Sequence, residues 1–191
     1  MAADARRRQI VDATVEVLAG AGYRATSFAR IAEHAHISST RLISYHFAGK
    51  DELMGEVVRS VVAGMGEHVA GRMRGERSAA GLLRAYIEGV VGYTVGHRTQ
   101  VQALFEIVLA GAVPAEAMNT DAGVTDDLER ILRRGQEAGE FRDFDPRIMA
   151  LAVQRAVDAL PLALRADPGI DGEHYARELV TLFELATRAA S

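Results

Sequence analysis

The sequence predicts an all-α protein with a helix-turn-helix head over residues 1–50 and a larger helical body over residues 51–191. Apolar residues recur at helical spacing along most of the chain, and no segment keeps the strict alternation expected of a half-buried strand. Glycine, proline and aspartate separate the helical segments. The 49% of hydrophobic residues is enough for a helical core.

The first predicted helix follows three adjacent arginines, Arg6 to Arg8. Its inner face consists of Ile10, Val11, Ala13, Thr14, Val17, Leu18 and Ala21. Gly20 and Gly22 are placed to end it. The arginines are interpreted in two ways that the sequence leaves open: an arm that reaches DNA phosphate, or a solvated N-terminus.

A short helix, a turn and a second helix follow. Thr26 is a suitable N-cap for a helix from about Ser27 to Ala35, and Ser38 and Ser39 offer two successive caps for the next helix. The second helix exposes hydrogen-bonding side chains that suit a helix lying in a major groove: Thr40, Arg41, Ser44 and Tyr45.

Five short runs in this region resemble the DNA-binding domain of the tetracycline-repressor (TetR) family. They are Ala25-Thr26-Ser27, Ile31-Ala32-Glu33, Ile37-Ser38-Ser39, Tyr45-His46-Phe47 and Lys50-Asp51-Glu52-Leu53. The resemblance is strong over residues 6–60 and weaker beyond. It implies a three-helix head that binds operator DNA and a helical body that binds a small effector and dimerises.

The chain departs from the family pattern in the turn, where His36 replaces the usual glycine. The family pattern can be matched at either Ser38 or Ser39, and both alignments stay open. The predicted DNA-binding residues, from the exposed face and the resemblance together, are Thr26, Ser39, Thr40, Arg41, Ser44, Tyr45, His46 and Lys50. Lys50 is the only lysine and begins a helix, where its charge favours a nearby anion, unless Asp51 and Glu52 neutralise it.

Charge is distributed unevenly along the chain. Residues 1–50 hold seven basic and four acidic residues, net +3, whereas the remainder holds 15 basic and 22 acidic residues, net −7. A basic head on an acidic body is expected when only the head meets the phosphate backbone of double-stranded DNA.

The body is predicted to continue as helices. A fourth helix from Asp51 to about Arg74 contains several glycines, which indicate either a hinge or close helix packing. The further helices are expected over Ala79 to Gly96, Arg98 to Ala112, Pro114 to Glu137, Pro146 to Arg165 and Gly172 to Ala190. The last two are rich in small and aliphatic residues, and two copies of each would form a four-helix bundle in a homodimer.

A small-molecule effector site is predicted in the body. Tyr86, Tyr93 and His97 share one helix face with Val90, and Glu106 could reach them from the next helix. An enzyme that used His97, Glu106 and Tyr93 for acid-base chemistry is the weaker interpretation, because no nucleophile-base pair or phosphate loop accompanies them.

The sequence indicates neither a cofactor nor a metal site. Cysteine is absent, and His34, His36 and His46 lack partners at ligand spacing. No apolar run is long enough for a membrane span or a signal peptide, so we expect a cytoplasmic protein. The predicted function is a ligand-released repressor that binds a pseudo-palindromic operator as a homodimer; the alternative is a helical ligand-binding or scaffold protein without DNA readout.

Overall fold

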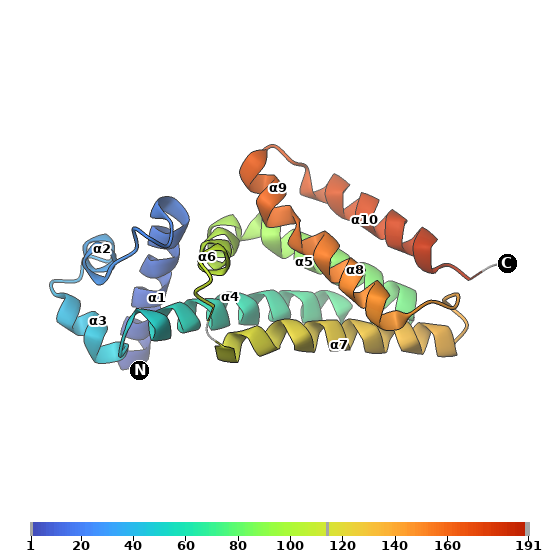
Figure 1. Ribbon diagram of the computed structural model, residues 1–191, viewed down its shortest axis with the longest axis horizontal. Helices are drawn as coiled ribbons and strands as arrows, with labels where there is room; N and C mark the ends of the chain where they lie inside the picture. Colours follow the sequence, from blue (N-terminus) through green and yellow to red (C-terminus); the bar gives the residue numbers. More distant parts are fainter. Residues whose placement is uncertain (1, 114, 190–191) are drawn as a thin grey trace. The chain divides into compact units, whose positions relative to one another are not determined.

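The computed structural model describes the backbone of residues 2–113 and 115–189, and the side chains of residues 4–113 and 123–189. Helices make up most of the described chain (Figure 1). They are α1 Ala2–Ala21, α2 Phe28–His34, α3 Thr40–His46, α4 Lys50–Met73, α5 Ala79–Gly96, α6 Arg98–Leu109, α7 Ala115–Glu137, α8 Pro146–Asp158, α9 Leu160–Ala166 and α10 Gly172–Thr187. Over the described residues no strand is present beyond one isolated bridge, Phe141 with Arg188. The predicted all-α fold is confirmed.

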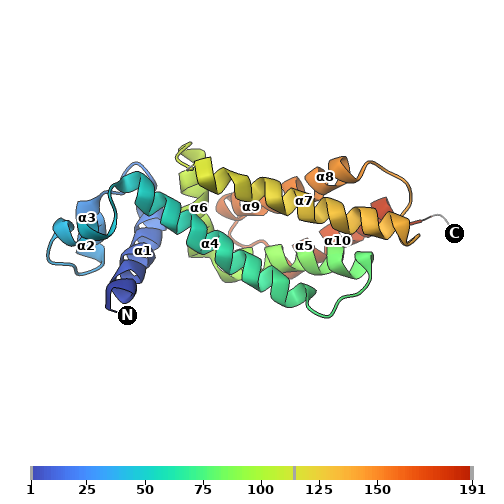
Figure 2. The same ribbon diagram turned by 90° about the horizontal axis from the view of Figure 1, so that it is seen from below.

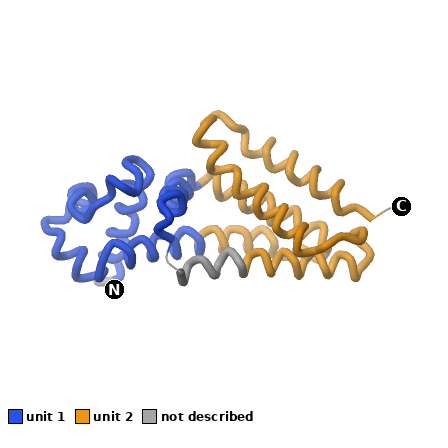
Figure 3. Tube along the Cα trace, viewed as in Figure 1, with its two compact units in different colours: residues 1–63, 97–118 blue, residues 64–96, 119–191 orange. Residues whose placement is uncertain are grey.

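The chain forms two compact units (Figure 3). Unit 1 comprises residues 1–63 and 97–118, and unit 2 comprises residues 64–96 and 119–191. Helix α4 contributes to both units, and α6 belongs to unit 1 although it follows α5 of unit 2 in the sequence. The functional boundary between residues 50 and 51 stays a prediction, because compact units reflect contacts rather than function.

Unit 1 is built around the buried face of α1. Ile10 and Leu18 are fully buried, as predicted, and α6 packs on α1. Ala103 and Ile107 of α6 are also inaccessible to solvent. The side chain of Gln102 on α6 donates to the carbonyl of Ala19 near the end of α1. Helix α6 therefore closes the core that supports α2 and α3.

Unit 2 is centred on α5, an apolar helix whose residues are mostly buried because other helices cover it on several sides. Figure 2 shows α5 running beside α10, and α8 and α9 also contact α5. The core joins Leu83 and Ile87 of α5 to Leu132 of α7, Val153 of α8 and Phe183 of α10. Burying this many apolar side chains in one cluster stabilises the unit, because each contributes roughly 1.5–3 kcal/mol on leaving water.

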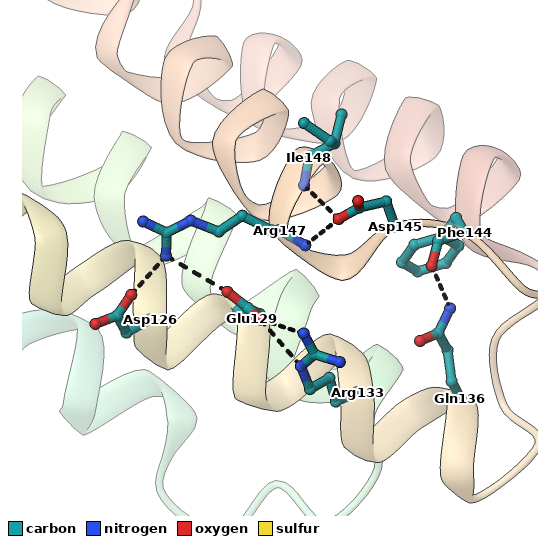
Figure 4. A network of polar contacts seen from close by, with 8 residues as sticks. All are labelled: Asp126, Glu129, Arg133, Gln136, Phe144, Asp145, Arg147 and Ile148. Atoms are coloured by element: carbon teal, nitrogen blue, oxygen red, sulfur yellow. Dashed lines mark hydrogen bonds and ion pairs between the residues drawn. The ribbon is translucent and has the colours of Figure 1, made fainter.

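Polar contacts fix the connection between α7 and α8 (Figure 4). Asp145 caps α8 by accepting from the backbone N–H groups of Arg147 and Ile148 at 2.9 and 3.1 Å. The Arg147 guanidinium reaches back to Asp126 and Glu129 on α7. The acidic partners hold the Arg147 pKa above its ordinary value. The start of α8 is thus set by its cap and by α7 together.

The prediction of a single helix over Pro146 to Arg165 is wrong. The chain forms α8 and α9, which are separated at Ala159. Pro161 explains the break, because it has no N–H to donate to the carbonyl of Val157 and its ring would clash with that carbonyl. The other predicted bounds differ by a few residues: α6 ends at Leu109 and α10 at Thr187. The predicted starting residue of α7, Pro114, and the predicted last residue of α10, Ala190, lie outside the described residues.

Candidate nucleic-acid interface

Helix α2 begins one residue later than predicted, and Thr26 is not its cap. Ser27 is the N-cap, and its hydroxyl accepts from the Arg30 backbone N–H at 3.3 Å. Thr26 is only 3% exposed, and its hydroxyl donates to the Gly22 carbonyl at 2.8 Å. Thr26 therefore stabilises the turn after α1 from inside unit 1.

The turn between α2 and α3 has the hydrogen bonds of a Schellman motif. The Ile37 N–H donates to the Ala32 carbonyl at 2.8 Å, and the His36 N–H donates to the Glu33 carbonyl at 3.1 Å. His36 has a φ of 53°, the left-handed conformation that usually requires glycine. The turn therefore has the left-handed residue that the family pattern fills with glycine, although the residue here is histidine.

Helix α3 presents a polar face. Ser39 is its N-cap and accepts from the Arg41 backbone N–H at 3.2 Å, whereas Ser38 lies in the preceding turn. Ile43 is fully buried and anchors the opposite face. The exposed residues of this segment are Ser38, Ser39, Thr40, Arg41, Ser44 and Tyr45. The structure thus brings five of the eight predicted DNA-binding residues together on one surface.

Tyr45 and His46 end this face. Tyr45 is 81% exposed, which is unusual for a large aromatic side chain on a folded domain. Its ring meets the half-buried His46 ring edge-on, with centroids 5.2 Å apart. An exposed tyrosine supported by a neighbouring ring keeps its hydroxyl available for an outside acceptor.

Lys50 is half-buried and is bonded within unit 1. Its ammonium group donates to the Tyr23 carbonyl at 2.9 Å and sits 3.9 Å from the centre of the Tyr23 ring. Burial lowers the pKa of Lys50, and the neighbouring Asp51 carboxylate partly opposes that shift. Lys50 therefore ties the start of α4 to the turn after α1.

The three N-terminal arginines lie within α1. Arg7 contacts the end of α3 and the first turns of α4, Arg6 donates to Gln9 of its own helix, and Arg8 is exposed. Sequence reasoning did not find the contacts of Arg7. Its partner Glu56 is 49 residues away, and no local pattern signals such a pair.

The predicted effector residues divide between the units. Tyr86 and Tyr93 are buried in unit 2, whereas His97 and Glu106 belong to unit 1. The Glu106 carboxylate accepts from the Tyr23 N–H at 3.4 Å. No single unit therefore contains all four predicted residues.

The buried tyrosines of α5 have polar surroundings within unit 2. The Tyr86 hydroxyl donates to the Gln154 side chain of α8, and that amide donates to Asp158 at 3.0 Å. Tyr93 has its pKa raised by burial, and its ring centroid is 5.9 Å from that of His68. Polar groups that run from a buried tyrosine to the exposed Asp158 are the kind of feature that orients a small molecule.

Unit 2 also contains a cavity of about 210 Å³ between α5 and α10. It is lined by Ala80, Leu83, Arg84, Ile87, Glu140, Phe141, Val180, Phe183, Glu184, Thr187 and Arg188. None of the four predicted effector residues lines it. The Glu140 carboxylate in this lining already accepts hydrogen bonds from the Ala79 and Ala80 N–H groups at the start of α5.

Among the described residues, no group of three or more potential ligand side chains could hold a metal ion. Nor does that part of the chain contain a helix both long and apolar enough to cross a membrane.

Residues 10–57, from α1 into α4, match the family model described as bacterial regulatory proteins, tetR family. The HTH-type transcriptional regulator BetI 1 of Chromohalobacter salexigens is 38% identical over 85 residues, which is 44% of this chain and 42% of that protein. The chain thus spans less than half the length of that relative. BetI of Cronobacter sakazakii is 28% identical over 187 residues, which covers 93% of this chain and 88% of that protein.

Solved structures share the fold over nearly the whole chain. A bacterial regulatory protein in the tetR family from Rhodococcus RHA1 has a TM-score of 0.84 at 20% identity, covering 97% of this chain and 98% of that one. AibR, solved with isovaleryl coenzyme A and operator DNA, has a TM-score of 0.80 at 18% identity, covering 93% and 97%. A putative regulator from Saccharomonospora viridis, solved with choline, has a TM-score of 0.79 at 20% identity, covering 98% and 100%.

Proposed function

Because this chain belongs to the tetR family of bacterial regulatory proteins, we propose that it is a ligand-responsive repressor that binds a pseudo-palindromic operator as a homodimer. The observation that carries the proposal is the polar face of α3, which follows a capped turn inside residues 10–57. A helix of this kind offers hydrogen-bonding side chains to a major groove. The proposed repressor acts in the cytoplasm, where the operator DNA lies.

Side chains of α3 have separate roles in this proposal. Ser39, Thr40, Arg41 and Ser44 face the base edges or adjacent phosphates from the start and middle of the helix. Tyr45 and His46, together with the head's excess of basic residues, bind the phosphate backbone and fix the register. Thr26 and Lys50 support the interface from behind, because their polar atoms already bond within unit 1.

Dimerisation is proposed through the outer surfaces of α8, α9 and α10. Five large aliphatic side chains there are exposed: Ile148, Leu151, Leu162, Leu182 and Leu185. Exposed apolar residues gathered on neighbouring helices are typical of an interface. A two-fold dimer would present two copies of α3 to half-sites about 34–36 Å apart.

The effector is proposed to bind in unit 2, beside the buried α5 tyrosines and the polar chain from Tyr86 through Gln154. Two structures that share the fold were solved with small molecules, isovaleryl coenzyme A and choline. They supply the first compounds to test. Release from DNA requires that the effector bind one conformational state more tightly than the other.

The test begins with selection of the purified protein on a random duplex pool, followed by salt titration of the enriched site. We expect an inverted repeat whose affinity falls steeply with salt. Arg41→Ala should relax base preference at one position, equivalent to about 1–3 kcal/mol, whereas Tyr45→Phe should weaken all duplexes alike. Arg74→Ala, which changes an exposed arginine just after α4, is the matched control.

Two results would contradict the proposal. One is no enriched sequence at any salt concentration. The other is wild-type affinity and selectivity in both Arg41→Ala and Tyr45→Phe. Enrichment of a single half-site without its inverted copy would retain DNA binding but reject the dimer.

A further inference from the structure

We propose that Arg7 is a positioning residue for DNA binding, which holds the end of α3, and with it Tyr45 and His46, in place from α1. The inference rests on the proposed DNA-binding function. It assigns to Arg7 an inward role within unit 1 instead of a phosphate contact.

Four groups surround the Arg7 guanidinium. Its Nη1 donates to the His46 carbonyl at 2.7 Å, and its Nη2 donates to the Glu56 carboxylate at 2.9 Å. Nη2 also lies 3.5 Å from Glu52, and the guanidinium carbon lies 4.2 Å from the centre of the Phe47 ring. One side chain of α1 therefore contacts the last residue of α3, the residue after it and two residues of α4.

The bond to His46 acts where α3 needs support. Helix α3 spans only seven residues, so its own backbone hydrogen bonds are too few to make it stable alone. The last carbonyls of a helix lack partners within the helix and carry partial negative charge. A guanidinium at the His46 carbonyl supplies both a donor and a favourable charge, and it fixes the turn that carries Tyr45 and His46.

The carboxylates that hold Arg7 also fix the connection between α3 and α4. Glu52 accepts from the Ala48 N–H at 2.7 Å, so it joins this connection to α4. Glu56 accepts from Arg59 as well as from Arg7, and both arginines keep its pKa below the ordinary value. The Glu56 carboxylate correspondingly raises the pKa of Arg7. The end of α3 is thus attached to two helices by one charged cluster.

This geometry gives Arg7 a different role from the neighbouring arginines. An arginine that neutralises phosphate points its guanidinium outward, but both terminal nitrogens of Arg7 are bonded inward. Arg8, the next residue in the sequence, is exposed. The two roles predict different salt dependence, since each lost phosphate contact lowers the slope of log affinity against log salt by about 0.9.

The experiment compares Arg7→Ala, Arg7→Lys and Arg8→Ala on the selected operator and on a scrambled duplex, each across a salt series. Arg8 is exposed and serves as the phosphate-contact comparison. We expect Arg7→Ala to weaken binding to the operator and to the scrambled duplex alike, by about tenfold and with an unchanged salt slope, because Tyr45 and His46 contact phosphate in any sequence and no phosphate-neutralising charge is lost. Arg7→Lys should recover part of the loss, because an ammonium group can satisfy one of the partners but not all. A salt slope reduced by about 0.9 would overturn the proposal in favour of a phosphate contact, and unchanged binding to both duplexes would overturn it outright.

A second measurement needs no DNA. The Phe47 N–H donates to the Ile43 carbonyl at 2.9 Å, and this bond closes the last turn of α3. Its amide should exchange with solvent several times faster in Arg7→Ala than in wild type or in Arg8→Ala. Unchanged exchange would refute the positioning role. If wild type binds no operator, the proposed function fails, and this exchange rate still decides whether Arg7 holds α3.

Discussion

Replacing His36 by glycine should stabilise the protein. His36 holds a left-handed conformation, with a φ of 53°. A side chain there costs roughly 1–2 kcal/mol, whereas glycine costs about 0.5–1 kcal/mol through the greater freedom of the unfolded chain. The difference favours His36→Gly by about 0.5–1 kcal/mol.

The assay is urea unfolding of wild type, His36→Gly and His36→Ala, followed by helical circular dichroism, with thermal melting as a check. For a chain of this size the gain corresponds to a rise of about 1–4 °C in Tm. His36→Ala is the matched control, because it removes the imidazole and keeps the Cβ that causes the strain. The reasoning is refuted if His36→Gly is no more stable than His36→Ala.

Three further predictions follow from other positions. Gly66→Ala, in the exposed part of α4 where an added Cβ meets nothing within 4 Å, should raise the free energy of unfolding by about 0.5–1 kcal/mol in urea titrations. Gly135→Ala should lower it by about 1–3 kcal/mol, because the new Cβ would overlap the Phe141 ring; unchanged stability would mean that this ring moves aside easily. The pKa of the Glu56 carboxyl is lowered from its ordinary value of 4.5, and the hydrogen bond from Arg59 is the largest cause. The carboxylate therefore stabilises the fold above pH 4.5, and this contribution is lost as the pH falls through the lowered pKa. The stability difference between wild type and Glu56→Gln should therefore shrink on acidification, and a constant difference would contradict the assignment.

The sequence predicted features that depend on neighbouring residues. Helical periodicity placed α5 at its observed bounds, and the exposed face of α3 was read correctly. Cap identity was less secure, because Thr26 and Ser27 are both good caps and only the burial of Thr26 decides between them. The break at Pro161 could have been predicted from that residue alone.

Contacts between distant segments could not be predicted. Lys50 donates to the carbonyl of Tyr23, 27 residues away in the sequence. The sequence pattern around Lys50 does not show whether its side chain bonds inward, as here, or points outward to a phosphate. The turn at His36 could be located only through the family resemblance, because the glycine that usually signals a left-handed residue is absent. The division of Tyr93 and His97 between two units follows from packing across the whole chain.

The membership of α6 in unit 1 has a consequence for anyone who wishes to graft the proposed DNA-binding head onto another protein. A contiguous piece that ends near residue 63 would lack α6, and the surface of α1 that α6 covers would meet water. Such a piece should be poorly soluble unless that surface is redesigned. A spliced gene, in which a short linker joins residue 63 to residue 97, would instead carry the complete core and is the better starting point for a portable module.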